Sequence, residues 1–226
     1  MIAQSIRGIG ALALILTSLT GFVSAEDHEE KVKTFQNAMN YSQDNKGCLS
    51  IPYSDLQDQC QRKQAGVVRW CKESGKWNCE DVDPKVLQAQ IERIKTERDR
   101  LKEERASYEQ KKDESKIKEI DNKLYELDRT RGELERQVAE ASKMVSDRTY
   151  VAKSCRDARP EVMEVFRSAK SRADSEQDPD IRPLAQRLIK YWESEESGHN
   201  EQIRTVKEAV EKCDRVLYDI GHLGNF

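Results

Sequence analysis

The sequence predicts an all-α protein: a long antiparallel coiled-coil hairpin flanked by small, disulfide-stapled helical ends. Residues 83–150 carry apolar side chains at coiled-coil spacing, with no proline beyond Pro84. The chain holds six cysteines, an even number. Only 36% of its residues are hydrophobic and 6% aromatic, which is poor for one large globular core. We therefore expect two small cores joined by a rod.

Residues 1–25 are typical of a secretory signal peptide. Arg7 is their only charged residue, and residues 9–19 form a short apolar core. Val23-Ser24-Ala25 supplies the small residues of a cleavage site, so the mature chain is expected to begin at Glu26. A membrane anchor needs about 20 apolar residues, and the serines and threonines of this segment argue against one. We predict export, to the periplasm or the extracellular space.

Residues 26–82 are predicted to form a four-cysteine helical domain. One helix is expected at about 27–43 and a second from Ser54 towards Glu73. Both Cys60 and Cys71 lie on one face of the second helix, but eleven residues apart, or roughly 16 Å at the helical rise. Bridged cysteines need Cα atoms under about 7 Å apart, so these two should not pair with each other.

Two connectivities then remain for this domain. The one that closes short loops, Cys48–Cys60 with Cys71–Cys79, is the prediction, and Cys48–Cys71 with Cys60–Cys79 is the alternative. The wide gaps between these cysteines argue against a zinc site, whose ligands usually come in close pairs.

Trp70 and Trp77 are expected to cover the stapled core, with a partner-binding surface as the second reading.

Residues 83–156 are predicted to form the coiled-coil hairpin, and Asp83-Pro84 is a good helix start. The seam has two runs: Leu87, Ile91, Ile94, Leu101 and Tyr108, then Ile117, Ile120, Leu124, Leu127, Leu134, Val138, Ala141 and Val145. Arginines fill three further seam positions, 98, 105 and 131, and an antiparallel partner could pair them with carboxylates.

The two runs are out of phase with each other. Nine residues separate Tyr108 from Ile117, where a continuous heptad repeat needs four or eleven. A chain reversal near residues 111–115 explains the gap, although the tip holds no glycine or proline. A single long helix that dimerises is the alternative. Between Asp83 and Arg148 there are 17 basic and 17 acidic residues, so the rod offers no basic stripe for nucleic acid.

Residues 157–226 are predicted to form a C-terminal helical segment that packs on the base of the coiled coil. Pro160 is expected to break the preceding helix, and a last helix should run from about 184 to 220. By elimination Cys155 would pair with Cys213. A simple hairpin would set Cys155 about ten positions short of Cys213, so this bond needs the break at Pro160.

Glu196 and His199 show the Glu-x-x-His spacing of di-iron carboxylate bundles. The chain contains no second such motif, so a metal-dependent enzyme is the least favoured hypothesis. Phosphate-loop, zincin and serine-hydrolase signatures are absent from the sequence.

These observations predict an exported, non-enzymatic helical protein without cofactor or metal, acting as a spacer or partner-binding coiled coil. Its partner would be another protein, or a second copy bound through the coiled coil, with no nucleic acid and no stable membrane insertion after cleavage. The alternative is a small disulfide-rich binding or inhibitor module at the N-terminal end, using Trp70 and Trp77.

Overall fold

The computed structural model describes residues 25–72 and 77–223, and within these ranges the chain is helical with no strand. The predicted all-α fold is confirmed. The predicted signal peptide lies outside the described residues up to residue 24, and Ala25 begins the first helix. In chain order the elements are α1 (Ala25–Gln43), η1 (Gly47–Ser50), α2 (Ser54–Cys71), α3 (Pro84–Lys111), α4 (Glu114–Asp174) and α5 (Arg182–Gly221).

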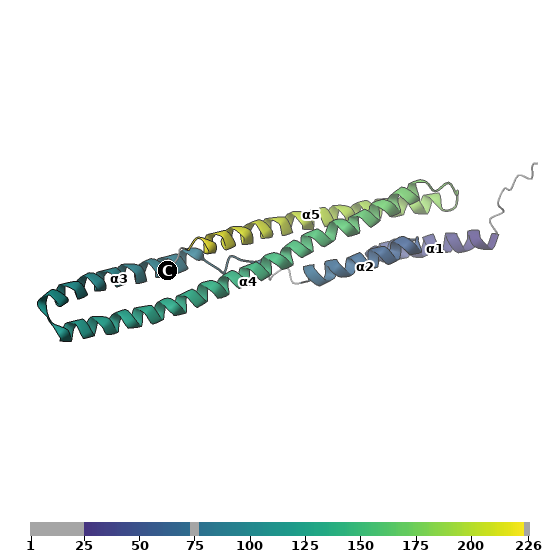
Figure 1. Ribbon diagram of the computed structural model, residues 1–226. Coiled ribbons are helices and arrows are strands. Elements are labelled where there is room, and N and C mark those ends of the chain that lie inside the picture. Colours follow the sequence, from purple (N-terminus) through teal and green to yellow (C-terminus); the bar gives the residue numbers. More distant parts are fainter. Residues whose placement is uncertain (1–24, 73–76, 224–226) are drawn as a thin grey trace, which may run out of the picture.

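Helix α4 is the spine of an elongated molecule (Figure 1). Its 61 residues span about 92 Å at the helical rise of 1.5 Å. Figure 1 shows α3 along the first half of α4 and α5 along the second, both antiparallel to it. The end of α5 meets the start of α3 there, over a core that includes Ile91, Val145 and Ile220.

The chain reversal falls where the phase gap predicts it. Helix α3 ends at Lys111, and Lys112 adopts the left-handed conformation with φ 55°. Asp113 then caps α4, its side chain accepting a hydrogen bond from the amide of Lys116. A lysine in the left-handed region thus replaces the glycine that such a turn usually takes.

The hairpin seam is thin, and two of its arginines are paired across it. Arg98 lies 3.1 Å from Asp128, and Arg105 lies 2.6 Å from Asp121. The predicted cross-helix pairing is confirmed at these two positions. At the third position, Arg131 is instead paired within α4, 3.5 Å from Glu135.

The predicted break at Pro160 is wrong, because α4 continues through Pro160 to Asp174. Proline removes one backbone hydrogen bond and crowds the preceding turn, a local cost of about 3 kcal/mol. Tertiary packing offsets that cost: Val162, Met163, Val165 and Phe166 directly after the proline are all buried. A continuous apolar face therefore outweighs one unfavourable residue.

The second half of α4 forms, with α5, α2 and α1, the main body of the protein. Its core includes Phe35, Ile51, Val162, Phe166, Leu188 and Trp192. The 3-10 turn is fastened to α5, since the indole of Trp192 donates to the hydroxyl of Ser50 at 2.9 Å. In addition, the amide of Gly47 donates to the hydroxyl of Tyr191 at 3.1 Å.

The disulfides are Cys48–Cys60, Cys71–Cys155 and Cys79–Cys213. The first was predicted correctly, whereas the predicted pairs Cys71–Cys79 and Cys155–Cys213 are wrong. Because α2 lies against α4, Cys71 faces Cys155 rather than the segment that follows it. Ion pairs between α4 and α5 confirm the register problem: Arg167 pairs with Glu196 and Lys170 with Glu193, a register that sets Cys155 opposite position 208 rather than Cys213.

Each of the two long-range bonds ties a segment near α2 to one of the long helices, over separations of 84 and 134 residues. Three disulfides indicate an oxidising, exported environment, because cytosolic thiols are kept reduced. Across the described residues, no helix is long and apolar enough to cross a membrane.

Candidate functional site

The two tryptophans that the sequence singles out have different environments. Trp77 is buried and packs in the hydrophobic core with Ala152, Val206 and Val210. Trp70 is only partly buried, at the end of α2. Of the two, only Trp70 can offer a surface to a partner.

Trp70 is the centre of a small aromatic patch beside the Cys71–Cys155 bond. Its ring meets that of Tyr150 edge to face, with centroids 5.6 Å apart, and the guanidinium of Arg69 lies 4.6 Å above it. Tyr150 is 62% exposed. Amphipathic aromatics together with arginine are typical of the contact centres of protein interfaces.

Glu196 and His199, the pair with metal-ligand spacing, take different partners. Glu196 lies 2.6 Å from Arg167. His199 is buried, and its Nδ1 accepts from Nη1 of Arg159 at 3.2 Å. The guanidinium takes the lone pair of Nδ1, and a neutral imidazole then carries its proton on Nε2, so neither ring nitrogen offers a metal ion a free lone pair.

Arg159 and His199 form a buried polar contact between α4 and α5. Arg159 is 8% exposed, and its Nε has no hydrogen-bond partner among the described residues. Burial lowers the pKa of Arg159. Burial, and then the nearby Arg159 charge, lower the pKa of His199 to about 4, so the imidazole is neutral at physiological pH.

The projecting part of the hairpin, residues 95–133, is named the arm here. Figure 1 shows it running away from the main body. Among its residues only Leu101 and Ile120 are buried. A shallow groove opens between its two helices, lined by residues that include Leu101, Leu127 and Thr130. Tyr125, 70% exposed, is its most prominent aromatic side chain.

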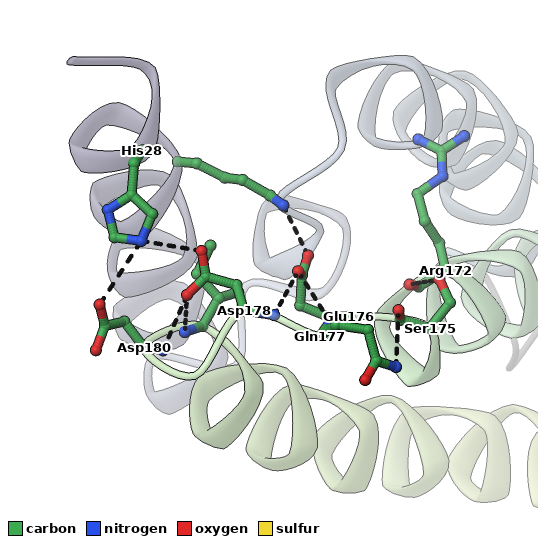
Figure 2. Close-up of polar contacts among 9 residues, drawn as sticks. His28, Arg172, Ser175, Glu176, Gln177, Asp178 and Asp180 are labelled. Atoms are coloured by element: carbon green, nitrogen blue, oxygen red, sulfur yellow. Dashed lines mark hydrogen bonds and ion pairs between the residues drawn. The ribbon is translucent and has the colours of Figure 1, made fainter. Parts of the chain in front are cut away.

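A third cluster lies at the opposite end of the molecule, where α1 meets the loop between α4 and α5 (Figure 2). The Nε2 atom of His28 lies 2.9 Å from a carboxylate oxygen of Asp178 and 3.6 Å from one of Asp180. These three side chains each offer one metal-ligating atom, all within 4.8 Å of one another. Nearby, Lys31 lies 2.8 Å from Glu176.

Asp178 also shapes the loop in which it sits. Its Oδ1 accepts from the amides of Asp180 and Ile181, at 2.9 and 3.3 Å. Burial by itself would raise the pKa of Asp178, but those amides and His28 together hold the pKa below its usual value. Asp178 is thus ionised and oriented, with its second oxygen directed at His28.

This cluster could not be predicted from the sequence, because His28 and Asp178 are 150 residues apart in the chain. One local signal was available: His28 is the third residue after the expected cleavage site.

Comparison with protein-family models, curated protein sequences and solved structures finds no match to the chain.

Proposed function

We propose that this is an exported, non-catalytic helical protein, delivered to the periplasm or the extracellular space, that acts as a spacer and partner-binding coiled coil. The observation that carries the proposal is the arm. A segment with only two buried side chains adds little to the stability of the main body. We therefore infer that the arm is long in order to hold a partner at a distance from the body. Its many charged side chains, balanced in sign, keep the arm soluble. The apolar residues that line its groove are then available for contact with a protein partner.

The spacer role is tested by shortening the arm without changing its register. Arg98–Asp128 and Arg105–Asp121 are two rungs of the hairpin, one heptad apart on each helix. Deleting residues 99–105 together with 121–127 removes one heptad from each helix and rejoins facing positions. The arm becomes shorter by about 10 Å. The variant is expected to keep its three disulfides and its helical circular dichroism, and to lose complementation of a deletion strain.

The partner-binding role is tested by photo-cross-linking in the native compartment. A benzophenone amino acid is placed at Tyr125 on the arm, and separately at Tyr150 and Tyr41, which are also exposed. The proposal expects one discrete adduct from Tyr125, the same protein in repeated experiments or a second copy of this chain. Full activity of the shortened variant combined with no adduct from Tyr125 would reject the proposal.

The aromatic patch around Trp70 supports a second candidate function, a binding or inhibitor module at the N-terminal end. Its edge-to-face ring pair and the guanidinium above Trp70 are a specific observation in its favour. An adduct from Tyr150 alone, abolished by Trp70→Ala, would select this function over the arm. The Tyr41 position, on α1, serves as the control for non-specific capture.

A further inference from the structure

The first three residues of the expected mature chain are Glu26, Asp27 and His28. Signal cleavage after Ala25 would create a free α-amino group on Glu26. The chain then presents four nitrogens in covalent order: this amine, the amides of Asp27 and His28, and Nδ1 of the imidazole. Consecutive members of that set can each close a small ring with one metal ion. Four nitrogens in a plane are the environment that Cu(II) and Ni(II) prefer.

We propose that export creates a square-planar site for Cu(II) or Ni(II) at the mature N-terminus, formed by the α-amine of Glu26, the amides of Asp27 and His28, and Nδ1 of His28. The proposal rests on the export part of the proposed function and is independent of the arm.

The contacts of His28 favour the ring nitrogen that this site needs. Its Nε2 faces Asp178 at 2.9 Å and Asp180 at 3.6 Å, so the carboxylates take up Nε2 and not Nδ1. A neutral imidazole that donates from Nε2 carries a lone pair on Nδ1. Histidines that bind metals usually donate their other ring nitrogen to a carboxylate in this way. Figure 2 shows Asp178 and Asp180 on the Nε2 side of the ring.

The local structure permits the rearrangement that chelation requires. The first amides of a helix have no partner one turn earlier, so binding through two of them breaks no interior helical hydrogen bond. Residues 25–27 and 29–31 are exposed, and the first buried side chain of α1 is Phe35. The first turn can therefore unwind around an ion while the rest of α1 stays packed.

The rival ligand set is His28 Nε2 with Asp178 and Asp180. It is the weaker choice, because Asp178 already accepts from two amides of its own loop through Oδ1. That pattern suits a carboxylate that orients a histidine more than one that binds an ion.

Binding is balanced by proton release and involves no change of oxidation state. One proton leaves the α-ammonium group, one leaves each of the two amides, and an imidazole that carries a second proton releases it as Nδ1 binds. Affinity should therefore rise steeply with pH. The class of ligand is a square-planar divalent ion, and Zn(II), which favours tetrahedral sites, should bind much more weakly.

The test uses the full mature protein, purified after export, with its N-terminus read by intact mass. Cu(II) alone is titrated, and binding is followed by the visible absorption and electron paramagnetic resonance of a four-nitrogen square-planar complex. We expect a mass that begins at Glu26 and one copper ion per chain. A mature chain that begins at any other residue overturns the proposal.

Two variants separate the ligand sets. One extra alanine before Glu26 moves His28 out of the third position and should abolish the square-planar spectrum, although it leaves the carboxylate cluster intact. Asp178→Asn should keep one copper ion per chain with the same spectrum, with an affinity lowered by about 10- to 100-fold. Binding that survives the added alanine and is lost in Asp178→Asn overturns the proposal in favour of the carboxylate cluster. Neither variant touches the arm, so the cross-linking result stands separately.

Discussion

At the scale of single residues, the least expected feature is a buried arginine that faces a histidine instead of a carboxylate. Arg159 and His199 are 8% and 7% exposed, and the guanidinium of Arg159 donates to the neutral imidazole. Such a contact is most stable while the imidazole stays neutral, because two buried cations side by side would repel. The contact therefore links the packing of α4 on α5 to pH.

The first prediction follows from the depressed pKa of His199, which is about 4 in the folded protein against an ordinary value of 6.5. Below pH 6.5 the unfolded chain binds a proton at this residue and the folded chain does not. Stability from this group is therefore full above pH 6.5 and is lost as the pH falls towards 4. Replacing it by asparagine (His199→Asn) keeps an acceptor near Nδ1 and removes the titration.

We expect the free energy of unfolding of the wild type to fall by about 1–2 kcal/mol more than that of His199→Asn between pH 6.5 and 4.5. Urea titrations at several pH values measure this difference. Parallel pH curves for the two proteins would contradict the assignment. Because His28 and His222 are present in both proteins, they cancel in the comparison.

At the scale of elements, the hairpin tip shows how a local cost is tolerated. Lys112 takes a positive φ, a conformation that costs a residue with a Cβ roughly 1–2 kcal/mol. The turn still forms, because Asp113 caps α4 and because the apolar faces of α3 and α4 must pack against each other on either side of it. The register of two helices thus overrides the preference of one residue.

The second prediction uses that strain. Substituting glycine (Lys112→Gly) should relieve it and stabilise the arm by about 0.5–1 kcal/mol. The same substitution at Lys118, exposed inside α4, should destabilise the arm by about 1 kcal/mol. Hydrogen exchange of amides in residues 95–133 reports both effects. Faster exchange in Lys112→Gly than in the wild type would show that the tip does not adopt this turn.

At the scale of the whole molecule, one helix of 61 residues fixes the length, and the other helices cover it in two sections. The section with α1, α2 and α5 has a substantial core, whereas the arm has almost none. The three disulfides all lie in or next to the thicker section. The disulfides and most of the buried surface are therefore concentrated at one end of the molecule, and the thin projecting arm forms the other end.

The third prediction is an elongated particle in solution. A compact globule of this size would have a radius of gyration of about 17 Å. The length of α4 alone requires a maximum dimension of about 90 Å or more. Small-angle scattering of the oxidised mature protein should therefore give a radius of gyration well above the globular value. A radius near that value would mean that the arm folds back on the body.

Much of this architecture could be predicted from local pattern. The heptads, the phase gap after Tyr108 and the capping residues depend on neighbours within a few turns, so the hairpin and its tip are readable from the chain. The pairing of Cys48 with Cys60 is also local, across a separation of 12 residues. The environment of Trp70, by contrast, depends on Tyr150, which lies 80 residues further along.

By itself, the sequence determined helix, hairpin and an even set of cysteines, because these follow from residue spacing along the chain. Only the tertiary structure decided that α4 runs through Pro160, that Cys71 meets Cys155 and Cys79 meets Cys213, and that His28 faces Asp178. The reason is physical. These outcomes depend on which helix faces pack together. The free energy gained by burying a whole helix face outweighs the local cost of a proline, and it also outweighs the advantage of pairing cysteines that are close in the chain.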